Sequence, residues 1–289
     1  MTDSVTREAT AKVNLFLRVL SRETGGYHSI ETLFCRIELA DTLVARRVEA
    51  PGITLEVSGA DTGPAEANLA LRAARVVQDA LRRPFGVSLT LTKRIPVGAG
   101  LGGGSADAAA ALSAVNELAG SALPRAELLH LAARLGADVP FCLSEAPLAM
   151  AWGHGERMLA LPALPSAPIL LVAPPAAVST AEAYQWVDAA REGAGSRGAV
   201  LLDAPSVGAW SDVARMAGND FESSVFGRLP VVREAFEALA RTRPLLCRMT
   251  GSGSTLVGVY RNERDRDDAM AMLGRKHGLL IPSRTVQAR

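Results

Sequence analysis

Apolar and polar residues alternate along the first third of the chain, and this alternation predicts strands. Between residues 11 and 19 every second position is apolar, which places Lys12 and Asn14 together on the opposite face of one strand. Further strands are predicted over 30–39, 42–46, 53–57 and 87–91. The opening part of the chain is therefore expected to be largely β.

Helices are predicted by apolar spacing and by the residues that begin and end them. One helix is expected from Asn68, which has the side chain of an N-cap, to Leu81. An alanine-rich helix follows over 106–118, and another over 124–135 starts with proline and has Gly136 just past its end. In the rest of the chain, strands are predicted over 147–152, 156–161 and 169–172, and a short helix is predicted from Thr180. Helices and strands then alternate over 231–239, 246–249, 254–260 and 264–277.

A length of 289 residues favours two domains. No clear linker separates them, so we place the boundary between residues 153 and 168, dividing the chain into 1–155 and 156–289. Residues 196–205 are rich in glycine, alanine and proline and are expected to form a flexible loop. The pattern as a whole predicts an α+β protein of two domains.

Charge and cysteine content exclude some classes of protein. A formal net charge of +1 argues against a broad surface for nucleic acid or membrane. The 3 cysteines are too widely spaced for a zinc site and odd in number, so they are expected to be buried thiols in a reducing compartment. No signal peptide or membrane-spanning stretch is predicted. We therefore expect a cytoplasmic protein with neither nucleic acid nor membrane as a partner.

Five glycines at positions 98, 100, 102, 103 and 104 lie between a predicted strand and a predicted helix. Glycine is expected where the backbone takes positive φ or lies against a ligand. The helix that follows adds free N–H groups and the positive end of its dipole, which attract an anion. An ordinary turn needs fewer glycines, and ordering five of them costs conformational entropy. The segment therefore predicts a phosphate-binding loop.

A nicotinamide-dependent oxidoreductase is one interpretation of this loop, because residues 98–103 satisfy the short dinucleotide-binding pattern. Three features oppose it. The loop follows a largely β segment, Pro96 interrupts the approach to the first glycine, and no acidic residue stands at the end of a second strand about 20 residues later. A Walker A motif is also absent, because Ser105 stands where a lysine would follow the last glycine.

The loop Pro96-Val-Gly-Ala-Gly-Leu-Gly-Gly-Gly-Ser-Ala106 resembles the second signature of the GHMP kinase superfamily, which cradles ATP phosphates. The first and third signatures resemble Ala11-Lys-Val-Asn-Leu15 and Met249-Thr-Gly-Ser-Gly-Ser254, in the same order along the chain. The resemblance implies a two-domain α+β GHMP kinase fold with the active site in the cleft between domains. Residues 1–155 would be the ATP-binding domain and 156–289 the substrate-side domain.

Within the superfamily the chain resembles the kinases that phosphorylate the 2-hydroxyl of 4-diphosphocytidyl-2-C-methyl-D-erythritol, with ATP and Mg²⁺, in the non-mevalonate route to isoprenoid precursors. The resemblance is carried by residues 12–14, 26–28, 102–105, 135–141 and 219–220. Two positions depart from the family: Gly25 and Ala106 stand where an aspartate and a second serine are frequent. A homoserine kinase-like enzyme is the alternative of the same class, but an amino-acid substrate needs no aromatic residue such as Tyr27. A non-catalytic nucleotide-binding module is a third interpretation.

The resemblance assigns Asp138 as the general base for the attacking alcohol and Lys12 as the cation that stabilises charge on the transferred group. Asp138 is expected on a short rigid loop, since it follows Gly136 and precedes Pro140. Asn68 corresponds to a residue that contacts adenine, although an N-cap explains it equally well. Lys93 either reaches ATP phosphates or is an ordinary surface charge. The expected ATP-binding residues are Asn68, Lys93, Pro96, Gly98, Gly100, Leu101, Gly102, Gly103, Gly104, Ser105 and Ala106.

The substrate is expected to be a small molecule carrying a cytidine diphosphate group. In the resembled family Tyr27 stacks on the cytosine and His28 bonds the edge of the base. Tyr184, with Trp186 as a poorer alternative, would supply a second stacking ring, although core packing explains either residue. Asn14 would line the site, and Gly251, Ser252 and Gly253 would hold substrate phosphates. No acidic cluster predicts magnesium ligands, so the ion is expected on ATP phosphates, Ser105 and water. The protein is expected to be a monomer or a homodimer.

Overall fold

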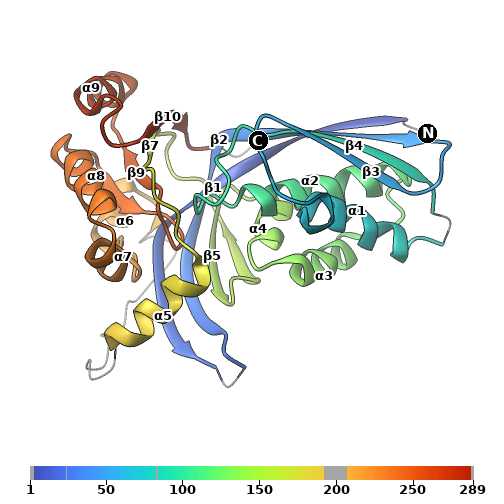
Figure 1. Ribbon diagram of the computed structural model, residues 1–289, viewed down its shortest axis with the longest axis horizontal. Coiled ribbons are helices and arrows are strands. Elements are labelled where there is room, and N and C mark those ends of the chain that lie inside the picture. The colour runs from blue at the N-terminus through green and yellow to red at the C-terminus, as the bar shows by residue number, and fades with distance from the viewer. Residues whose placement is uncertain (1–2, 24, 83, 192–206, 288–289) are drawn as a thin grey trace. The chain divides into compact units, whose positions relative to one another are not determined.

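The computed structural model describes residues 3–23, 25–82, 84–191 and 207–287 (Figure 1), so the predicted flexible loop at 196–205 lies outside the described residues. The chain forms two compact units whose segments interleave. Unit 1 comprises Met1–Lys12, Leu39–Val97 and Gly102–Ala146, and unit 2 comprises Val13–Glu38, Gly98–Leu101 and Pro147–Arg289. Each unit is described below by itself.

Two long paired strands, β1 (Ser4–Arg22) and β2 (His28–Val48), contribute residues to both units. The sequence pattern predicts two strands at 30–39 and 42–46, but the structure has one continuous strand. The predicted break falls at Asp41, whose side chain is fully buried and paired with Lys93. A buried charge that is compensated elsewhere in the fold does not interrupt a strand, and an alternation rule cannot detect that compensation.

Unit 1 has strands in the order β3-β4-β2, with β3 (Ile53–Ser58) parallel to β4 (Gly86–Thr92) and β4 antiparallel to β2. Figure 1 shows its helices gathered against one face of these strands. Alanines of α2 are buried on several sides of the helix, and their small side chains allow α1 and α2 to pack closely. The helices are η1 (Ala65–Ala67), α1 (Leu69–Ala80), α2 (Gly103–Leu118), α3 (Arg125–Leu135) and α4 (Val139–Ser144).

Unit 2 contains two groups of strands. Antiparallel β5 (Leu148–Gly153) and β6 (Arg157–Leu161) continue outward from β2. A separate antiparallel sheet has the order β10-β7-β9-β8, formed by β7 (Pro168–Ala173), β8 (Leu246–Met249), β9 (Leu256–Val259) and β10 (Leu279–Arg284). The helices are α5 (Thr180–Arg191), α6 (Trp210–Met216), α7 (Glu222–Arg228), α8 (Pro230–Arg241) and α9 (Glu263–Leu273).

The core of unit 2 lies between this second sheet and its helices. Leu170 and Leu256 from the sheet and Leu239 from α8 are fully buried there. Tyr260 is 1% exposed, and its hydroxyl lies 2.7 Å from Thr242 Oγ1, which satisfies the buried polar atom. In the part of the chain that the structure describes, no helix is long and apolar enough to span a bilayer.

The sequence pattern misses three α-helices, α4, α6 and α7, together with the 3₁₀ helix η1 and the strand β10. The three helices have 6 or 7 residues, too few for a 3.6-residue period to repeat convincingly. Helix α2 also begins earlier than predicted, at Gly103 instead of residue 106. Glycine is a poor helix former, so the first turn carries no helical signal of its own.

Candidate active site

In unit 1, the glycine-rich segment ends at the N-terminus of α2. Gly102 is the N-cap residue and has φ +69°, a left-handed conformation that glycine adopts without strain. No side chain among the described residues caps this helix, and the first N–H groups of an α-helix have no acceptor within the helix. Gly103, Gly104 and Ser105 form that first turn. A 16-residue helix thus presents uncapped donors and the positive end of its dipole, as an anion site requires.

Lys12 lies directly against this helix terminus. A Cβ atom placed on Gly102 would be 3.0 Å from both Cγ and Cε of Lys12, so a side chain at this position would displace the lysine. Lys12 Nζ is 3.1 Å from Asp138 Oδ2. The Lys12 side chain is 5% exposed and that of Asp138 is 28% exposed. The structure therefore brings the two predicted catalytic residues together, beside the predicted phosphate loop, within one unit.

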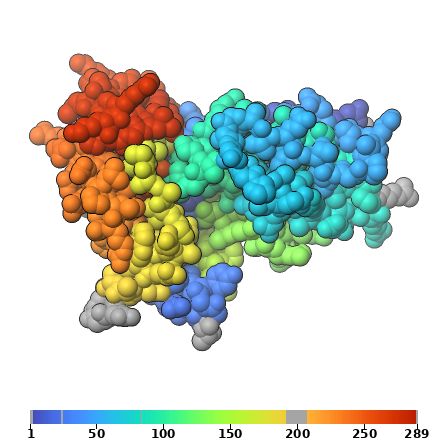
Figure 2. Space-filling view, viewed as in Figure 1, coloured from blue at the N-terminus to red at the C-terminus, as the bar shows by residue number. Residues whose placement is uncertain are grey.

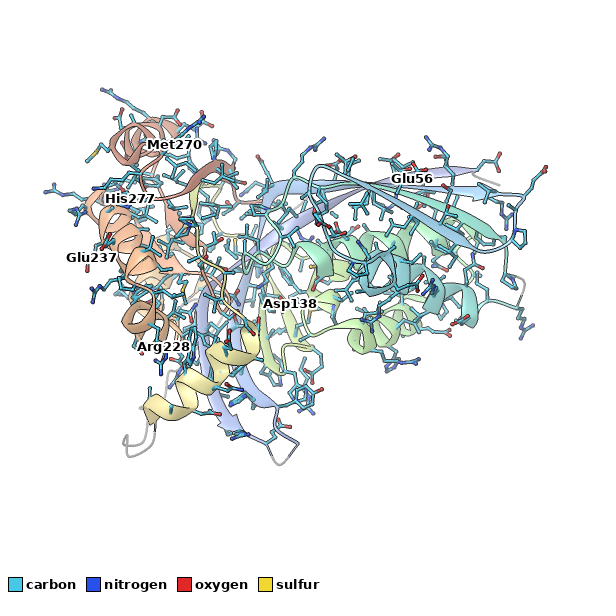
Figure 3. The ribbon with its side chains drawn as sticks, viewed as in Figure 1. Glu56, Asp138, Arg228, Glu237, Met270 and His277 are labelled. Atoms are coloured by element: carbon cyan, nitrogen blue, oxygen red, sulfur yellow. The ribbon has the colours of Figure 1, made fainter. Side chains whose placement is uncertain are left out.

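Asp138, which is labelled in Figure 3, occupies the N-cap position of α4. Pro140 lies in the first turn of that helix. As expected, Asp138 lies in a short connection, between α3, which ends at Leu135, and α4, which begins at Val139. Its neighbours Val139 and Phe141 are fully buried, which fixes the backbone on which the carboxylate stands.

Lys93 is buried, so the interpretation as an ordinary surface charge is wrong. Its ammonium is paired with Asp41 and, at 2.6 Å, with Asp107 Oδ2. Asp41 also accepts hydrogen bonds from the backbone N–H groups of Arg94 and Ile95. Because residues 93–95 precede the glycine-rich segment and Asp107 lies in α2 just after it, these charges hold both ends of that segment.

Burial raises the pKa of Asp107 to about 7, although the neighbouring Lys93 ammonium acts in the opposite direction. Within the described chain, Asp107 Oδ1 is buried and has no hydrogen-bond partner. The Lys93 ammonium would lie 3.4 Å from a Cβ atom on Gly103, close to the first turn of α2. A contact between Lys93 and ATP stays a prediction.

Asn68 caps α1, as predicted from the sequence. Its side-chain oxygen accepts a hydrogen bond from the N–H of Ala70 at 2.9 Å, and its amide donates to Thr62 Oγ1 at 3.2 Å. The predicted contact with adenine is not tested by these interactions.

In unit 2, the third glycine-containing signature forms the connection between β8 and β9, and two asparagines hold it. Asn14 Oδ1 accepts a hydrogen bond from the N–H of Gly251 at 3.0 Å, while its amide donates to Thr32 Oγ1 at 2.7 Å. The amide of Asn219 donates to the carbonyl of Gly251 at 2.8 Å and to that of Met249. Asn14 and Asn219 therefore fix the shape of this connection from two sides.

Residues 98–101 of the first glycine-rich segment pack against the same connection, also within unit 2. A Cβ atom on Gly100, whose φ is +76°, would lie 2.6 Å from the carbonyl oxygen of Thr250. A side chain at this position would collide with backbone, so the two segments can approach only because Gly100 has none. Beside them, the hydroxyls of Ser252 and Thr180 are 3.0 Å apart. Two signatures that are distant in sequence thus meet through their backbones.

The predicted base-binding residues also lie in unit 2. Tyr27 is 67% exposed, and its ring is stacked on that of His154 with centroids 5.0 Å apart. The ring of His28 is stacked on that of Tyr184, with centroids 4.4 Å apart and planes 13° apart. His28 Nε2 is 2.8 Å from Asp188 Oδ1. The sequence assigns no role to His154 or Asp188, because nothing local connects either of them to residues 26–28.

Tyr184 and Trp186 have different surroundings on α5. Tyr184 contacts His28 and also meets Phe221 edge-on at 5.0 Å. Trp186 packs against the core of unit 2, with the guanidinium of Arg228 lying 5.2 Å from its ring. The structure therefore brings Tyr184, and not Trp186, to the predicted base-binding histidine.

Among the described residues, no group of three or more histidine, cysteine, aspartate or glutamate side chains is arranged to hold a metal ion. Ser105, in the first turn of α2, is half-buried at the predicted phosphate site. The expectation that magnesium is held by phosphate oxygens, Ser105 and water stays a prediction.

Comparisons with known families match both parts of the chain. Residues 68–146 match the GHMP kinases N terminal domain, and residues 199–278 match the GHMP kinases C terminal domain. The chain is 41% identical over 281 residues to the 4-diphosphocytidyl-2-C-methyl-D-erythritol kinase of Rhodospirillum rubrum, covering 96% of this chain and 90% of the relative. It is 38% identical over 285 residues to the enzyme of the same name from Pelotomaculum thermopropionicum, covering 99% of each chain.

Solved structures give the same result. The fold is similar to a crystal structure of 4-(cytidine 5'-diphospho)-2C-methyl-D-erythritol kinase, with a TM-score of 0.82 and 34% identity over 97% of this chain and 98% of that chain. Homoserine kinase from Cytophaga hutchinsonii matches with a TM-score of 0.71 and 17% identity over 100% of this chain and 95% of that chain. The second similarity concerns the fold alone.

Proposed function

Because the chain belongs to the GHMP kinases, and within them to the 4-diphosphocytidyl-2-C-methyl-D-erythritol kinases, we propose that it transfers the γ-phosphate of ATP to the 2-hydroxyl of 4-diphosphocytidyl-2-C-methyl-D-erythritol. The products are the 2-phosphate and ADP, and the reaction is a step in the non-mevalonate route to isoprenoid precursors. The observation that carries this proposal in the structure is the Lys12–Asp138 pair, 3.1 Å apart, beside the uncapped N-terminus of α2.

The N-terminus of α2 binds the phosphates of ATP. Its first N–H groups donate to phosphate oxygens, and Gly98, Gly100 and Gly102 allow the backbone to come close to them. The pairing of Lys93 with Asp41 and Asp107 fixes the ends of the glycine-rich segment before the nucleotide arrives. Phosphoryl transfer requires mainly positioning and charge stabilisation, so a preformed loop contributes directly to the rate.

Asp138 accepts the proton of the attacking hydroxyl. Its carboxylate is partly exposed, so an alcohol can reach it, while the ion pair with Lys12 holds one oxygen in place. Lys12 is almost enclosed, and its charge is therefore weakly screened where negative charge develops on the transferred group.

We propose that Mg²⁺ is bound mainly by the phosphates of ATP, with Ser105 Oγ as the ligand from this chain. When bound, the ion neutralises phosphate charge during transfer. This assignment fits the described residues, which offer a hydroxyl at the helix N-terminus and no carboxylate cluster that would hold the metal by itself.

The cytidine diphosphate group of the substrate is bound by residues of unit 2. Tyr27 stacks on the base, His28 bonds its edge, and Tyr184 is the second aromatic residue at this position. The backbone of Gly251, Ser252 and Gly253 holds substrate phosphates, in a connection whose shape Asn14 and Asn219 fix. Asn14 itself lines the substrate side.

We further propose that residues 1–155 bind mainly ATP and residues 156–289 mainly the substrate, and that the protein acts in the cytoplasm as a monomer or a homodimer. All three cysteines, Cys35, Cys142 and Cys247, are free thiols, which suits a reducing compartment.

An ADP-release assay tests the reaction. The protein is incubated with ATP and Mg²⁺ together with the cytidine substrate, homoserine or mevalonate in parallel. We expect ADP release with the cytidine substrate only, and a product whose new phosphate is on the 2-hydroxyl by phosphorus NMR. Faster release with homoserine would favour the other kinase, and ATP consumption independent of any alcohol would contradict the proposal.

A thermal-shift comparison separates the kinase from the oxidoreductase interpretation. A ligand that binds the folded state raises its stability by mass action. We expect ATP analogues, and not NADH, to raise the melting temperature. The opposite result would mean that the glycine-rich segment binds a dinucleotide.

A further inference from the structure

The imidazole of His28 is held on two sides by one face of α5. Tyr184 lies over the ring with planes 13° apart, and Asp188 Oδ1 is 2.8 Å from Nε2. Residues four apart project from the same side of a helix, so Tyr184 and Asp188 reach the same imidazole. Figures 1 and 2 show α5 beside the β1–β2 end from which His28 comes.

The contact with Asp188 determines which nitrogen of His28 carries hydrogen. An ionised carboxylate accepts hydrogen bonds and donates none, so Nε2 must donate to Asp188. In a neutral imidazole the other nitrogen, Nδ1, is then an acceptor. Arg22 lies 3.8 Å from the second oxygen of Asp188, so both carboxylate oxygens face nitrogen atoms.

The stacking contact with Tyr184 orients the plane of the imidazole. The hydrogen that a base donates to an imidazole nitrogen lies near the plane of that imidazole, because the nitrogen lone pair lies in the ring plane. Tyr184 is nearly parallel to His28 and covers one face of its ring, so a base can hydrogen-bond to the ring only through an edge nitrogen. Because Nε2 is occupied by Asp188, Nδ1 is the ring nitrogen left for a hydrogen bond with the base.

An acceptor at Nδ1 distinguishes cytosine from uracil where it faces position 4 of the base. Cytosine presents an amino group at N4, which can donate to Nδ1, whereas the uracil oxygen at the same position is an acceptor. Two acceptors facing each other leave both unpaired, which disfavours the uridine ligand. We infer that Asp188 is a positioning residue that sets the hydrogen-bonding state of His28 and thereby gives the enzyme its preference for cytidine over uridine substrates. This inference rests on the proposed function, in which His28 bonds the base.

Substrate kinetics test this role. The ratio of kcat/KM for the cytidine substrate to kcat/KM for its uridine counterpart is measured for the unmodified protein, for Asp188→Ala and for Glu182→Gln. Glu182 is an exposed acid on the same helix, so its variant controls for the loss of one negative charge from α5. We expect the ratio to fall at least tenfold in Asp188→Ala, mainly through KM of the cytidine substrate, with kcat little changed. A tenfold change corresponds to about 1.4 kcal/mol.

A spectroscopic measurement tests the same inference without catalysis. Nitrogen-15 NMR of the imidazole side chains identifies the protonated nitrogen of each histidine, and the signals missing from His28→Gln belong to His28. We expect hydrogen on Nε2 and an unprotonated Nδ1 in the unmodified protein, and loss of this fixed state in Asp188→Ala. Hydrogen on Nδ1 of the unmodified, neutral ring would overturn the inference.

The outcomes separate the two levels of the argument. If the unmodified protein does not phosphorylate the cytidine substrate, the proposed function fails. If it does, and Asp188→Ala retains the full preference for cytidine while Glu182→Gln behaves normally, only the role of Asp188 is refuted. A fall in kcat with an unchanged cytidine-to-uridine ratio would also refute it, because that pattern indicates a general structural defect.

Discussion

The packing of Lys12 against Gly102 gives a test in which stability and turnover respond differently. Gly102→Ala introduces a Cβ atom at φ +69°, where a residue other than glycine costs about 1–2 kcal/mol. The new atom would also lie 3.0 Å from Cγ and Cε of Lys12, closer than ordinary contacts allow. The lysine side chain is flexible, so we expect it to move and to add little to the loss of stability.

Movement of Lys12 affects catalysis more than folding. Its ammonium is 3.1 Å from Asp138 Oδ2, and a catalytic group misplaced by about 1 Å can lower the rate by about 100-fold. We therefore expect kcat of Gly102→Ala to fall by between about 10-fold and 100-fold, equivalent to about 1.4–2.7 kcal/mol in the barrier.

Gly120→Ala is a matched control in the same unit. Gly120 has φ +74° just beyond the other end of α2, and a Cβ atom there would meet no heavy atom within 4 Å. We expect the same loss of about 1–2 kcal/mol in urea unfolding, because the backbone cost is the same. Turnover should be that of the unmodified protein, since no side chain is displaced.

Both variants are measured by equilibrium urea unfolding and by ADP release at saturating ATP and substrate. The reasoning is refuted if Gly102→Ala keeps normal kcat, because Lys12 would then tolerate displacement or lack the assigned role. It is also refuted if Gly102→Ala loses several kcal/mol more stability than Gly120→Ala, because the new atom would then be colliding with more than one movable side chain.

Four other predictions concern single residues. Asp138→Asn should abolish turnover with little effect on ligand binding measured by calorimetry, because the amide cannot accept the proton; near-normal turnover would remove the residue from the role of base. Tyr27→Ala should weaken binding of the cytidine substrate by about 1–3 kcal/mol, and unchanged affinity would show that the ring does not stack on the base. Burial raises the pKa of the Cys35 thiol to about 12, so it should react with a thiol reagent at neutral pH only after unfolding, and rapid labelling of the folded protein would contradict its burial. Burial also raises the pKa of Glu222. As pH rises from about 4, the unfolded state therefore releases a proton that the folded state still holds. This difference lowers the free energy of unfolding until the pH passes the folded pKa of Glu222. Glu222→Gln keeps an acceptor for the N–H of Met249 and removes the titration, so its urea midpoint should fall less over that range; an equal fall in both proteins would exclude this group.

The sequence by itself determined many of the regular elements and the family. Alternation over residues 11–19 predicted part of β1, and the cap at Asn68 marked the start of α1, because strand faces and helix ends depend on neighbouring residues. The glycines from 98 to 104 predicted a segment with unusual backbone conformations. Gly98, Gly100 and Gly102 do have positive φ.

Only the tertiary structure decided which side chains meet. Lys93 has the sequence context of a surface charge, yet it lies buried between Asp41 and Asp107, which are contributed by different elements. The stacking of His154 on Tyr27 depends on the register of β2 with β5, which pairs Ile30 with Gly153. Asp188 reaches His28 because the packing of α5 within unit 2 brings this helix beside the first residue of β2.

The physical reason for this division is the range of the interactions. Hydrophobic periodicity and capping act between residues a few positions apart, so they can be recognised in the chain. A buried charge is tolerable only when an opposite charge comes from elsewhere in the fold, and strand register is chosen by the whole sheet. Both depend on segments that are distant in sequence. The same long-range packing brings Lys12 into contact with Asp138, and His28 into contact with Asp188.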